Sequence, residues 1–194
     1  MRLGIISDTH GSLCAWEQSL HVLGDVDLLL HAGDVLYHGP RNPLPDGHDA
    51  KGLADAINQY PGRIVIARGN CDADIDQVVI DVPIQAPYAL VIIEGMSIVV
   101  LHGHATSEED LRDLMRRFGL SFIVTGHTHI PGIVKPLGDS GGVIINPGSP
   151  ALPKTAERRG TCAIIEDEVA RIVHVDDGSE LMSSTWRRVS GRIL

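Results

Sequence analysis

Residues 2–10 read RLGIISDTH, a mostly apolar run that ends directly in Asp8, Thr9 and His10. The same arrangement returns along the chain, because runs rich in valine and isoleucine each end in glycine, aspartate, asparagine or histidine. These runs predict strands at 2–7, 27–32, 63–67, 97–101, 121–125 and 142–145. Continuous apolar runs of this length are typical of strands that are buried on both faces.

Three helices are predicted between these strands. Ser12 is the expected N-cap of the first, and Gly24 follows it as a stop. The second helix begins after Asp49, and the third after Ser107, which forms an approximate capping box with Asp110. Alternating strands and helices predict an α/β fold with a largely parallel portion.

Further segments give weaker signals. Residues 78–82 and 88–94 resemble a hairpin-type pair of strands, and residues 161–166 and 169–175 resemble a closing hairpin. The hairpins suggest a mixed second sheet. The tail from about residue 178 is polar and without a clear period, so we expect it to be poorly ordered.

Length and charge limit the classes of function. A chain of 194 residues suits one compact domain, so we expect a single domain over residues 1–194. The formal net charge is −9, and no basic run exceeds two residues. A protein that binds nucleic acid along its phosphates usually presents a basic face, so we do not expect nucleic acid as a partner.

Several features favour a cytoplasmic protein. No apolar stretch approaches the roughly 20 residues that a membrane span requires, so no membrane partner is expected. The apolar run at the N-terminus is too short for a secretory signal. The three cysteines, Cys14, Cys71 and Cys162, are few and widely spaced, which is typical of a reducing compartment.

Five short polar segments follow the predicted strands. Because ligands bind outside the carboxyl ends of strands in an open α/β sheet, we expect these segments to meet at one edge. Their oxygen and nitrogen donors suit divalent ions such as Mn²⁺, Fe²⁺ or Zn²⁺. The segments are Asp8-Thr9-His10, Gly33-Asp34, Gly69-Asn70, His102-Gly103-His104 and Gly126-His127-Thr128-His129.

In this order, the segments resemble the motifs of the calcineurin-like metallophosphoesterases. The finer resemblance is to the YfcE-type bacterial phosphodiesterases. It rests on GDVLYHGPRNPLP at 33–45, GNCD at 69–72, GHTHIP at 126–131 and NPGS at 146–149. The resemblance implies a four-layer α/β/β/α sandwich.

The resemblance also implies a centre of two divalent metal ions, with manganese as the first expectation and zinc or iron(II) as alternatives. Asp34 would bridge the ions. One ion would be held by Asp8, His10 and His129, and the other by Asn70, His102 and His127.

The implied activity is the hydrolysis of a small phosphodiester by in-line attack of a metal-bridging hydroxide. The residues expected to be catalytic are His104, Asn70 and Asp34. A phosphomonoesterase with the same centre is one alternative, although the few cations near the motifs favour diesters. A metal-stabilised interaction scaffold without activity is another. A homo-oligomer is a further possibility, since the closing hairpin is expected to present an apolar surface.

One position departs from the broad family, because Cys71 stands where many members have histidine after Gly69-Asn70. A thiol is a poor acid near neutral pH, so the sequence does not identify the residue that assists departure of the leaving group. His104 is the candidate for that role. The alternative is that His104 only forms a hydrogen bond with a neighbouring side chain. Cys71 is expected to line the substrate site, either by contact or by packing alone.

The loop at 37–47 follows a strand end and is rich in proline and glycine. It contains His38 and Arg41, which we expect to bind substrate, with Arg41 as a possible clamp on phosphate. A rigid connector is the alternative for this loop. His31 is interpreted as a core or supporting residue rather than a metal ligand.

Overall fold

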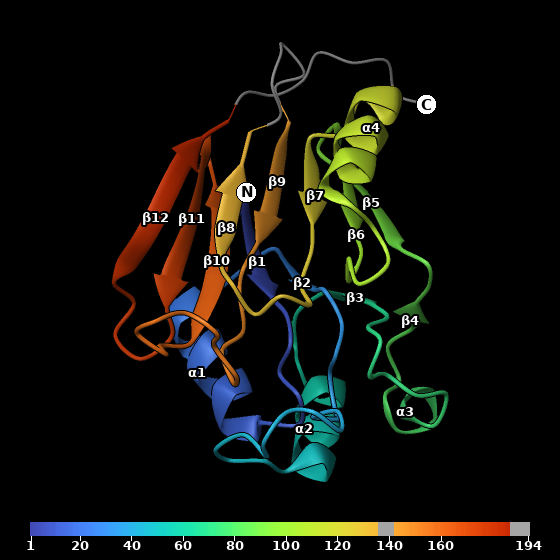
Figure 1. The fold of residues 1–194 in the computed structure, drawn as a ribbon, viewed down its shortest axis with the longest axis vertical. Coiled ribbons are helices and arrows are strands. Elements are labelled where there is room, and N and C mark those ends of the chain that lie inside the picture. The colour runs from blue at the N-terminus through green and yellow to red at the C-terminus, as the bar shows by residue number, and fades with distance from the viewer. Residues whose placement is uncertain (136–141, 187–194) are drawn as a thin grey trace.

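The computed structural model describes residues 1–135 and 142–186, which form two sheets flanked by helices (Figure 1). The sheets lie face to face, and helices cover the outer face of each. The order of layers is therefore α/β/β/α, which confirms the fold implied by the sequence resemblance.

The larger sheet has seven strands in the order β12-β11-β10-β1-β2-β3-β4. The four strands from β1 to β4 run parallel, and β10 joins β1 antiparallel. The bounds are β1 Arg2–Ile6, β2 Leu28–His31, β3 Ile64–Ala67, β4 Ile84–Gln85, β10 Thr161–Glu166, β11 Val169–His174 and β12 Glu180–Thr185.

The smaller sheet has five strands in the order β5-β6-β7-β9-β8. Its central strands β6, β7 and β9 run parallel, and both edge strands are antiparallel to their neighbours. The bounds are β5 Ala89–Ile93, β6 Met96–Val100, β7 Phe122–Val124, β8 Gly132–Val134 and β9 Val143–Asn146.

Four helices are present in the described residues: α1 Leu13–Leu23, α2 Ala50–Asn58, α3 Asp76–Val79 and α4 Glu108–Phe118. The predicted caps are confirmed. The side chain of Ser12 accepts the N–H of Ala15, and that of Asp49 accepts the N–H of Gly52. Ser107 and Asp110 form the capping box at the start of α4.

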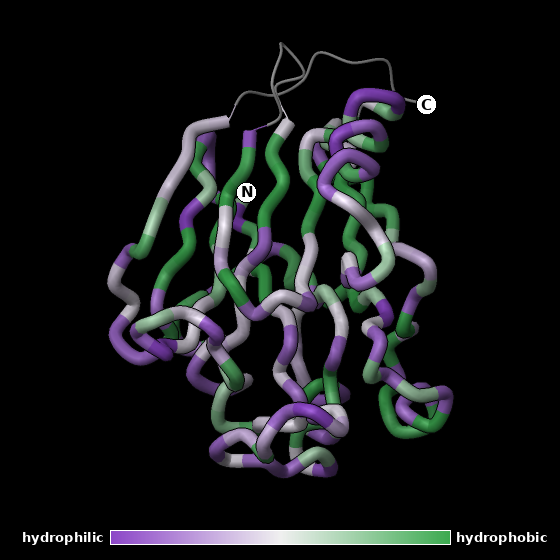
Figure 2. Tube along the Cα trace, in the orientation of Figure 1, coloured by the Kyte–Doolittle hydropathy of each residue, from purple (hydrophilic) through white to green (hydrophobic). Residues whose placement is uncertain are grey.

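The main core lies between the two sheets, where Ile5 and Leu30 of the larger sheet meet Phe122 and Ile145 of the smaller one. On the outer face of the larger sheet, Trp16 of α1 packs into a second cluster with residues of α2. Hydrophobic residues follow the strands, and hydrophilic residues gather in the loops below them in the view of Figure 2. Burial of apolar surface on both faces stabilises these strands.

Three expectations about the strands are wrong. Residues 78–82 contain no strand, because α3 ends at Val79 within this stretch and Val78 and Val79 are exposed. The side chain of Asp76 accepts the N–H of Ala73 and favours a helical turn there. The strand predicted at 88–94 is present as β5, but it pairs with β6. The closing hairpin joins the first sheet rather than a second one, because β10 pairs with β1.

The expectation of a poorly ordered tail is wrong for residues 180–185, which form β12 along β11. The last part of that tail, residues 187–194, lies outside the described residues. Over residues 1–135 and 142–186, no helix combines the length and apolar composition needed to cross a bilayer.

Candidate metal centre

The polar segments that follow the parallel strands of both sheets meet at one place. Three strands of the larger sheet, β1, β2 and β3, lead into this place, as do β6 and β7 of the smaller sheet. The side chains brought together here are those of Asp8, His10, Asp34, Asn70, His102 and His129, with His127 beside them.

Three of the histidines are held in one orientation by backbone carbonyl groups. The Nδ1–H groups of His10, His102 and His129 donate to Tyr37 O at 2.7 Å, Ala32 O at 2.7 Å and Leu152 O at 2.6 Å. A carbonyl oxygen only accepts, so Nδ1 carries the proton in each ring. In the neutral ring, each Nε2 atom is then left with a lone pair directed at the centre, as in histidines that bind metals.

The first group of donors converges on Asp8. Its Oδ1 atom lies 3.3 Å from His129 Nε2 and 3.7 Å from His10 Nε2, and the two Nε2 atoms are 3.1 Å apart. This Oδ1 atom is buried and has no hydrogen-bond partner among the described residues. A buried carboxylate oxygen without a partner is costly, and two facing lone pairs repel each other. A cation among these three atoms removes both costs, so the group fits a divalent metal ion.

A second group adjoins the first through Asp34. His102 Nε2 lies 3.1 Å from Asn70 Oδ1 and 3.2 Å from Asp34 Oδ2. The same Asp34 oxygen is 3.8 Å from His10 Nε2, so it stands between the two groups. The ring of His127 is 5.2 Å from that of His102.

Electrostatics favours ionised carboxylates at this centre. Burial raises the pKa of Asp8, but the nearby rings of His129 and His102 and the hydroxyl of Ser7 outweigh it, so the net pKa is lowered. The pKa of Asp34 is also lowered, because His102 and the N–H of Cys71 outweigh its burial. Burial lowers the pKa of His102, but Asp34 and Asp8 outweigh that effect and raise it to about 9. The carboxylates therefore attract a positive charge, which a metal ion supplies in place of a proton.

The backbone is strained at most of these residues. Asp8, His10, Asp34, His127 and His129 all have φ between 49° and 69°. The left-handed region is unfavourable for residues with a Cβ, and such strain concentrates at functional sites. The tight turns allow a single short loop to present two donor side chains to the centre, as in Asp8-Thr9-His10.

Asp72 is a supporting residue that the sequence analysis did not single out. Its buried carboxylate accepts the backbone N–H groups of Asp34, Val35 and Gly69 at 2.9, 2.7 and 2.6 Å. These bonds join the loops after β2 and β3, which carry Asp34 and Asn70. Burial raises the pKa of Asp72 to about 6. A sequence pattern offers no signal that separates this buried acid from an exposed one.

Beside the centre lies a pocket of about 480 Å³. It is lined by Asn70, Cys71 and His127, by residues of the loop after β2, and by Lys154. Arg41 also lines it, and its side chain is exposed. Lys154 is a cation that the sequence analysis missed, because it follows no strand end and belongs to no motif.

His104, expected to be catalytic, and His38, expected to bind substrate, lie in different settings. His104 is exposed at the rim, with its ring 5.6 Å from that of His102 and 6.1 Å from that of His127. His38 does not line the pocket, because its ring packs edge-on against Tyr37 and His48.

Cys71 is held as a thiol. Burial and the neighbouring Asp34 raise its pKa to about 12, so it is protonated at neutral pH. Its side chain accepts a hydrogen bond from Asn70 Nδ2 at 3.3 Å and lies against Gly39. A thiol with this pKa is neither a nucleophile nor a proton donor near pH 7.

His31 lies inside the fold and supports the centre from behind, as interpreted from the sequence. Its Nδ1 accepts the N–H of Gly33 at 3.1 Å, so Nε2 carries the proton and donates to Thr9 Oγ1, also at 3.1 Å. Burial lowers the pKa of His31 to about 4.

We expect His31 to make stability depend on pH. The unfolded chain binds a proton at this residue below pH 6.5, whereas the folded chain does so only below about pH 4. Stability from His31 is therefore present above pH 6.5 and is lost as the pH falls toward 4. We compare the free energy of unfolding at pH 7.5 and at pH 4.5, measured by urea unfolding of metal-free protein. Over this range it should fall by roughly 2–3 kcal/mol more in the wild-type protein than in His31→Asn. Equal losses in both proteins would contradict this assignment.

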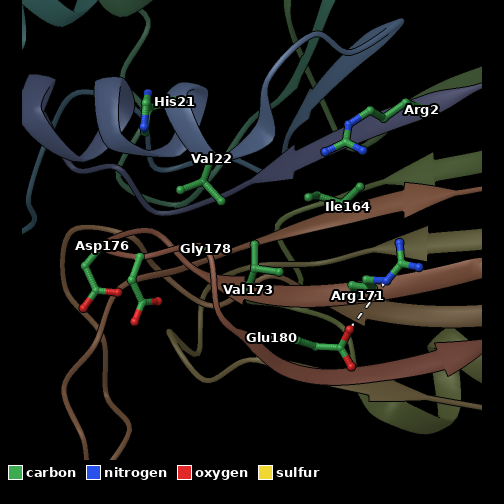
Figure 3. A pocket seen from close by; sticks show the side chains of 10 residues that line it. Arg2, His21, Val22, Ile164, Arg171, Val173, Asp176, Gly178 and Glu180 are labelled. Atoms are coloured by element: carbon green, nitrogen blue, oxygen red, sulfur yellow. Dashed lines mark ion pairs between the residues drawn. The ribbon is translucent and has the colours of Figure 1, made fainter.

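A different hollow, of about 450 Å³, lies between α1 and the strands β10 to β12 (Figure 3). Its cations are balanced by acids, since Arg171 lies 3.5 Å from Glu180 and Arg2 lies 2.8 Å from Glu166. Arg2 begins β1, whereas Asp8 follows its end, so this hollow is separate from the metal centre.

Comparisons with known proteins agree with the geometry. Residues 1–169 match the family model of the calcineurin-like phosphoesterase superfamily domain. Phosphodiesterase YfcE of Escherichia coli (strain K12) is 34% identical over 183 residues, which cover 92% of this chain and 95% of YfcE. A solved structure of YfcE, a phosphoesterase from E. coli, has a TM-score of 0.82 at 30% identity and covers 96% of this chain and all of its own. The structure of Vacuolar Protein Sorting 29 from Cryptosporidium parvum has a TM-score of 0.64 at 16% identity, over 95% and 97% of the chains, and shows the fold alone.

Proposed function

Because the chain belongs to the calcineurin-like phosphoesterase superfamily, we propose that it is a phosphodiesterase that depends on two divalent metal ions, with manganese preferred. The observation that carries this proposal is the convergence of Asp8 Oδ1 with the Nε2 atoms of His10 and His129. These are competent metal donors in one buried place, and the carboxylate oxygen has no other partner in the part of the chain that the structure describes.

The distances support an assignment of donors to two ions. Asp8, His10 and His129 would hold one ion, since their atoms lie within 3.7 Å of one another. Asn70, His102 and His127 would hold the other. Asp34 would bridge them, because its Oδ2 atom faces both His102 and His10. When bound, the ions would neutralise charge on the phosphate and supply a hydroxide nucleophile near neutral pH.

The protein's own part is to orient these donors and to position the substrate. The carbonyl groups that accept from Nδ1 fix the ring orientations, and Asp72 fixes the loops that carry Asp34 and Asn70. Arg41 and Lys154 line the pocket next to the centre, where Arg41 would attract the phosphate. Cys71 would contact the substrate as a neutral side chain.

Leaving-group assistance is assigned to His104. Its exposed ring stands near both His102 and His127, at the rim where an alcohol would depart. His38 packs against His48 and lies away from the pocket lining, so it would act on the substrate only through the loop that carries Arg41.

The test is an assay of metal-stripped protein with added Mn²⁺ on bis(p-nitrophenyl) phosphate and p-nitrophenyl phosphate. We expect turnover of the diester to exceed that of the monoester by about tenfold or more, because a monoester carries an additional charge and the pocket presents only exposed cations. His127→Ala should abolish turnover of both, and Arg117→Gln on the far side of α4 is the control. A preference for the monoester would replace the proposal with a phosphomonoesterase.

A further inference from the structure

A second hollow, of about 690 Å³, adjoins the pocket at the metal centre. Asn42 and Lys154 line both spaces. The second hollow runs from these residues past Pro153 to Arg158. A substrate bound at the metals therefore has room for one of its arms beyond the reacting phosphate.

The charge of this second hollow is unusual for the chain. Its lining includes Lys154 and Arg158, and no carboxylate lines it among the described residues. The whole chain has a formal net charge of −9. The hollow of Figure 3 is the contrasting case, because there Arg171 is paired with Glu180 and further acids line the same space. A hollow whose charged side chains are all positive favours the binding of an anion.

The two cations are also free to bind. Within residues 1–135 and 142–186, neither Lys154 nor Arg158 forms an ion pair, whereas the adjacent Arg159 contacts Asp176 at 2.6 Å and Asp177 at 2.8 Å. Arg158 has a φ of 51°, in the left-handed region, and its N–H donates to Thr155 O in a tight turn. Strain of this kind is typical of functional positions.

The segment that carries Lys154 is tied to the metal centre. Ser149 Oγ donates to Asp8 O at 2.7 Å, and Leu152 O accepts from His129 Nδ1. The N–H of Lys154 itself donates to His129 O at 3.2 Å. The position of the Lys154 backbone therefore follows from that of two metal donors.

Resting on the proposed phosphodiesterase activity, we propose that this second hollow is an anion subsite and that the preferred substrates are phosphodiesters carrying a further phosphate or carboxylate on one arm. Lys154 and Arg158 bind that anionic group. The lining of the hollow also includes the aliphatic side chains of Pro43, Ala151, Leu152 and Pro153, which suit a short carbon chain. No aromatic side chain lines the hollow among the described residues, so it lacks a platform for stacking a nucleobase.

The kinetic test uses p-nitrophenyl alkyl phosphates in matched pairs, with and without a terminal phosphate, over a series of alkyl lengths. For the best length, kcat/KM of the phosphorylated diester should exceed that of its partner by about tenfold, mostly through KM, as charged hydrogen bonds imply. Arg158→Gln and Lys154→Gln should each reduce this ratio, and Arg158→Lys should retain part of it. Arg117→Gln, an exposed arginine on α4, should leave the ratio unchanged.

Calorimetry of the Mn²⁺-loaded protein supplies a readout without turnover, using butane-1,4-diol bisphosphate and butyl phosphate. The bisphosphate should bind more tightly, and Arg158→Gln should remove the difference. Equal kcat/KM values within each pair, or a preference that survives both glutamine variants, would overturn the subsite. If no diester is hydrolysed, the proposed activity fails, and calorimetry alone decides: a difference removed by Arg158→Gln supports the subsite, and equal affinities refute it.

Discussion

Asp34→Asn should lower the turnover of a phosphodiester by at least about a thousandfold, equivalent to about 4 kcal/mol in the activation barrier. The substitution preserves the size of the side chain and an oxygen that can accept from Cys71 N–H, now at 2.7 Å. It removes the negative charge from the atom that faces both His10 and His102. The cost therefore arises from weaker metal binding and not from lost packing.

The control for this variant is Asp55→Asn, which removes an exposed charge whose one ion pair among the described residues is with Lys51. An exposed pair of this kind is screened by solvent and contributes little, so activity and metal content should stay at the wild-type level. Metal content by elemental analysis and turnover with saturating Mn²⁺ provide the comparison. An Asp34→Asn protein that holds two ions and turns over at the wild-type rate would remove Asp34 from the bridging position.

Gly126→Ala should destroy the centre through a single methyl group. A Cβ atom on Gly126 would lie 1.9 Å from Ser7 Oγ and 2.7 Å from Asp8 Oδ2. Both atoms are buried, and Ser7 Oγ donates to Asp8 Oδ2 at 2.7 Å, so neither yields without moving the Asp8 carboxylate. We expect a loss of stability of about 1–3 kcal/mol or more, together with loss of metal binding.

Gly132→Ala is the matched control, because a Cβ atom at Gly132 would meet nothing within 4 Å. Thermal unfolding with and without Mn²⁺ separates the two effects. Wild-type protein and Gly132→Ala should gain stability from the metal, whereas Gly126→Ala should gain little. A normal metal-dependent gain in Gly126→Ala would mean that Asp8 tolerates displacement, against the tight packing described above.

Much of the centre could be predicted because its residues follow buried strands directly. Asp8, Asp34 and His102 each come just after an apolar run, and parallel strands bring such positions to a common edge. The conformation of these residues was not predictable. The positive φ angles of Asp8, His10 and His129 depend on contacts with other loops, which a single sequence does not reveal.

The errors in the fold have local causes. Apolar content alone suggested a strand at 78–82, yet Val78 and Val79 are exposed within the short helix α3, whose first residue, Asp76, accepts the N–H of Ala73. The strand β12 has the largely polar sequence ELMSST. It pairs with β11, and of its side chains Met182 packs against the main core. Polar edge strands of this kind resemble loops when read alone.

Residues that act through geometry alone were the hardest to find. Asp72 joins two loops by three backbone hydrogen bonds, and Lys154 reaches the pocket from a loop after β9. Nothing in the spacing of either residue marks it. The structure is needed to see which acid is buried and which lysine lacks an acidic partner.

The most direct test of the central claim is a titration of metal-stripped protein with Mn²⁺, in which bound metal and hydrolysis of bis(p-nitrophenyl) phosphate are followed together. The account predicts no turnover without metal and a maximum when two ions are bound per chain. Turnover that persists in the stripped protein, or two bound ions without any turnover, would contradict it.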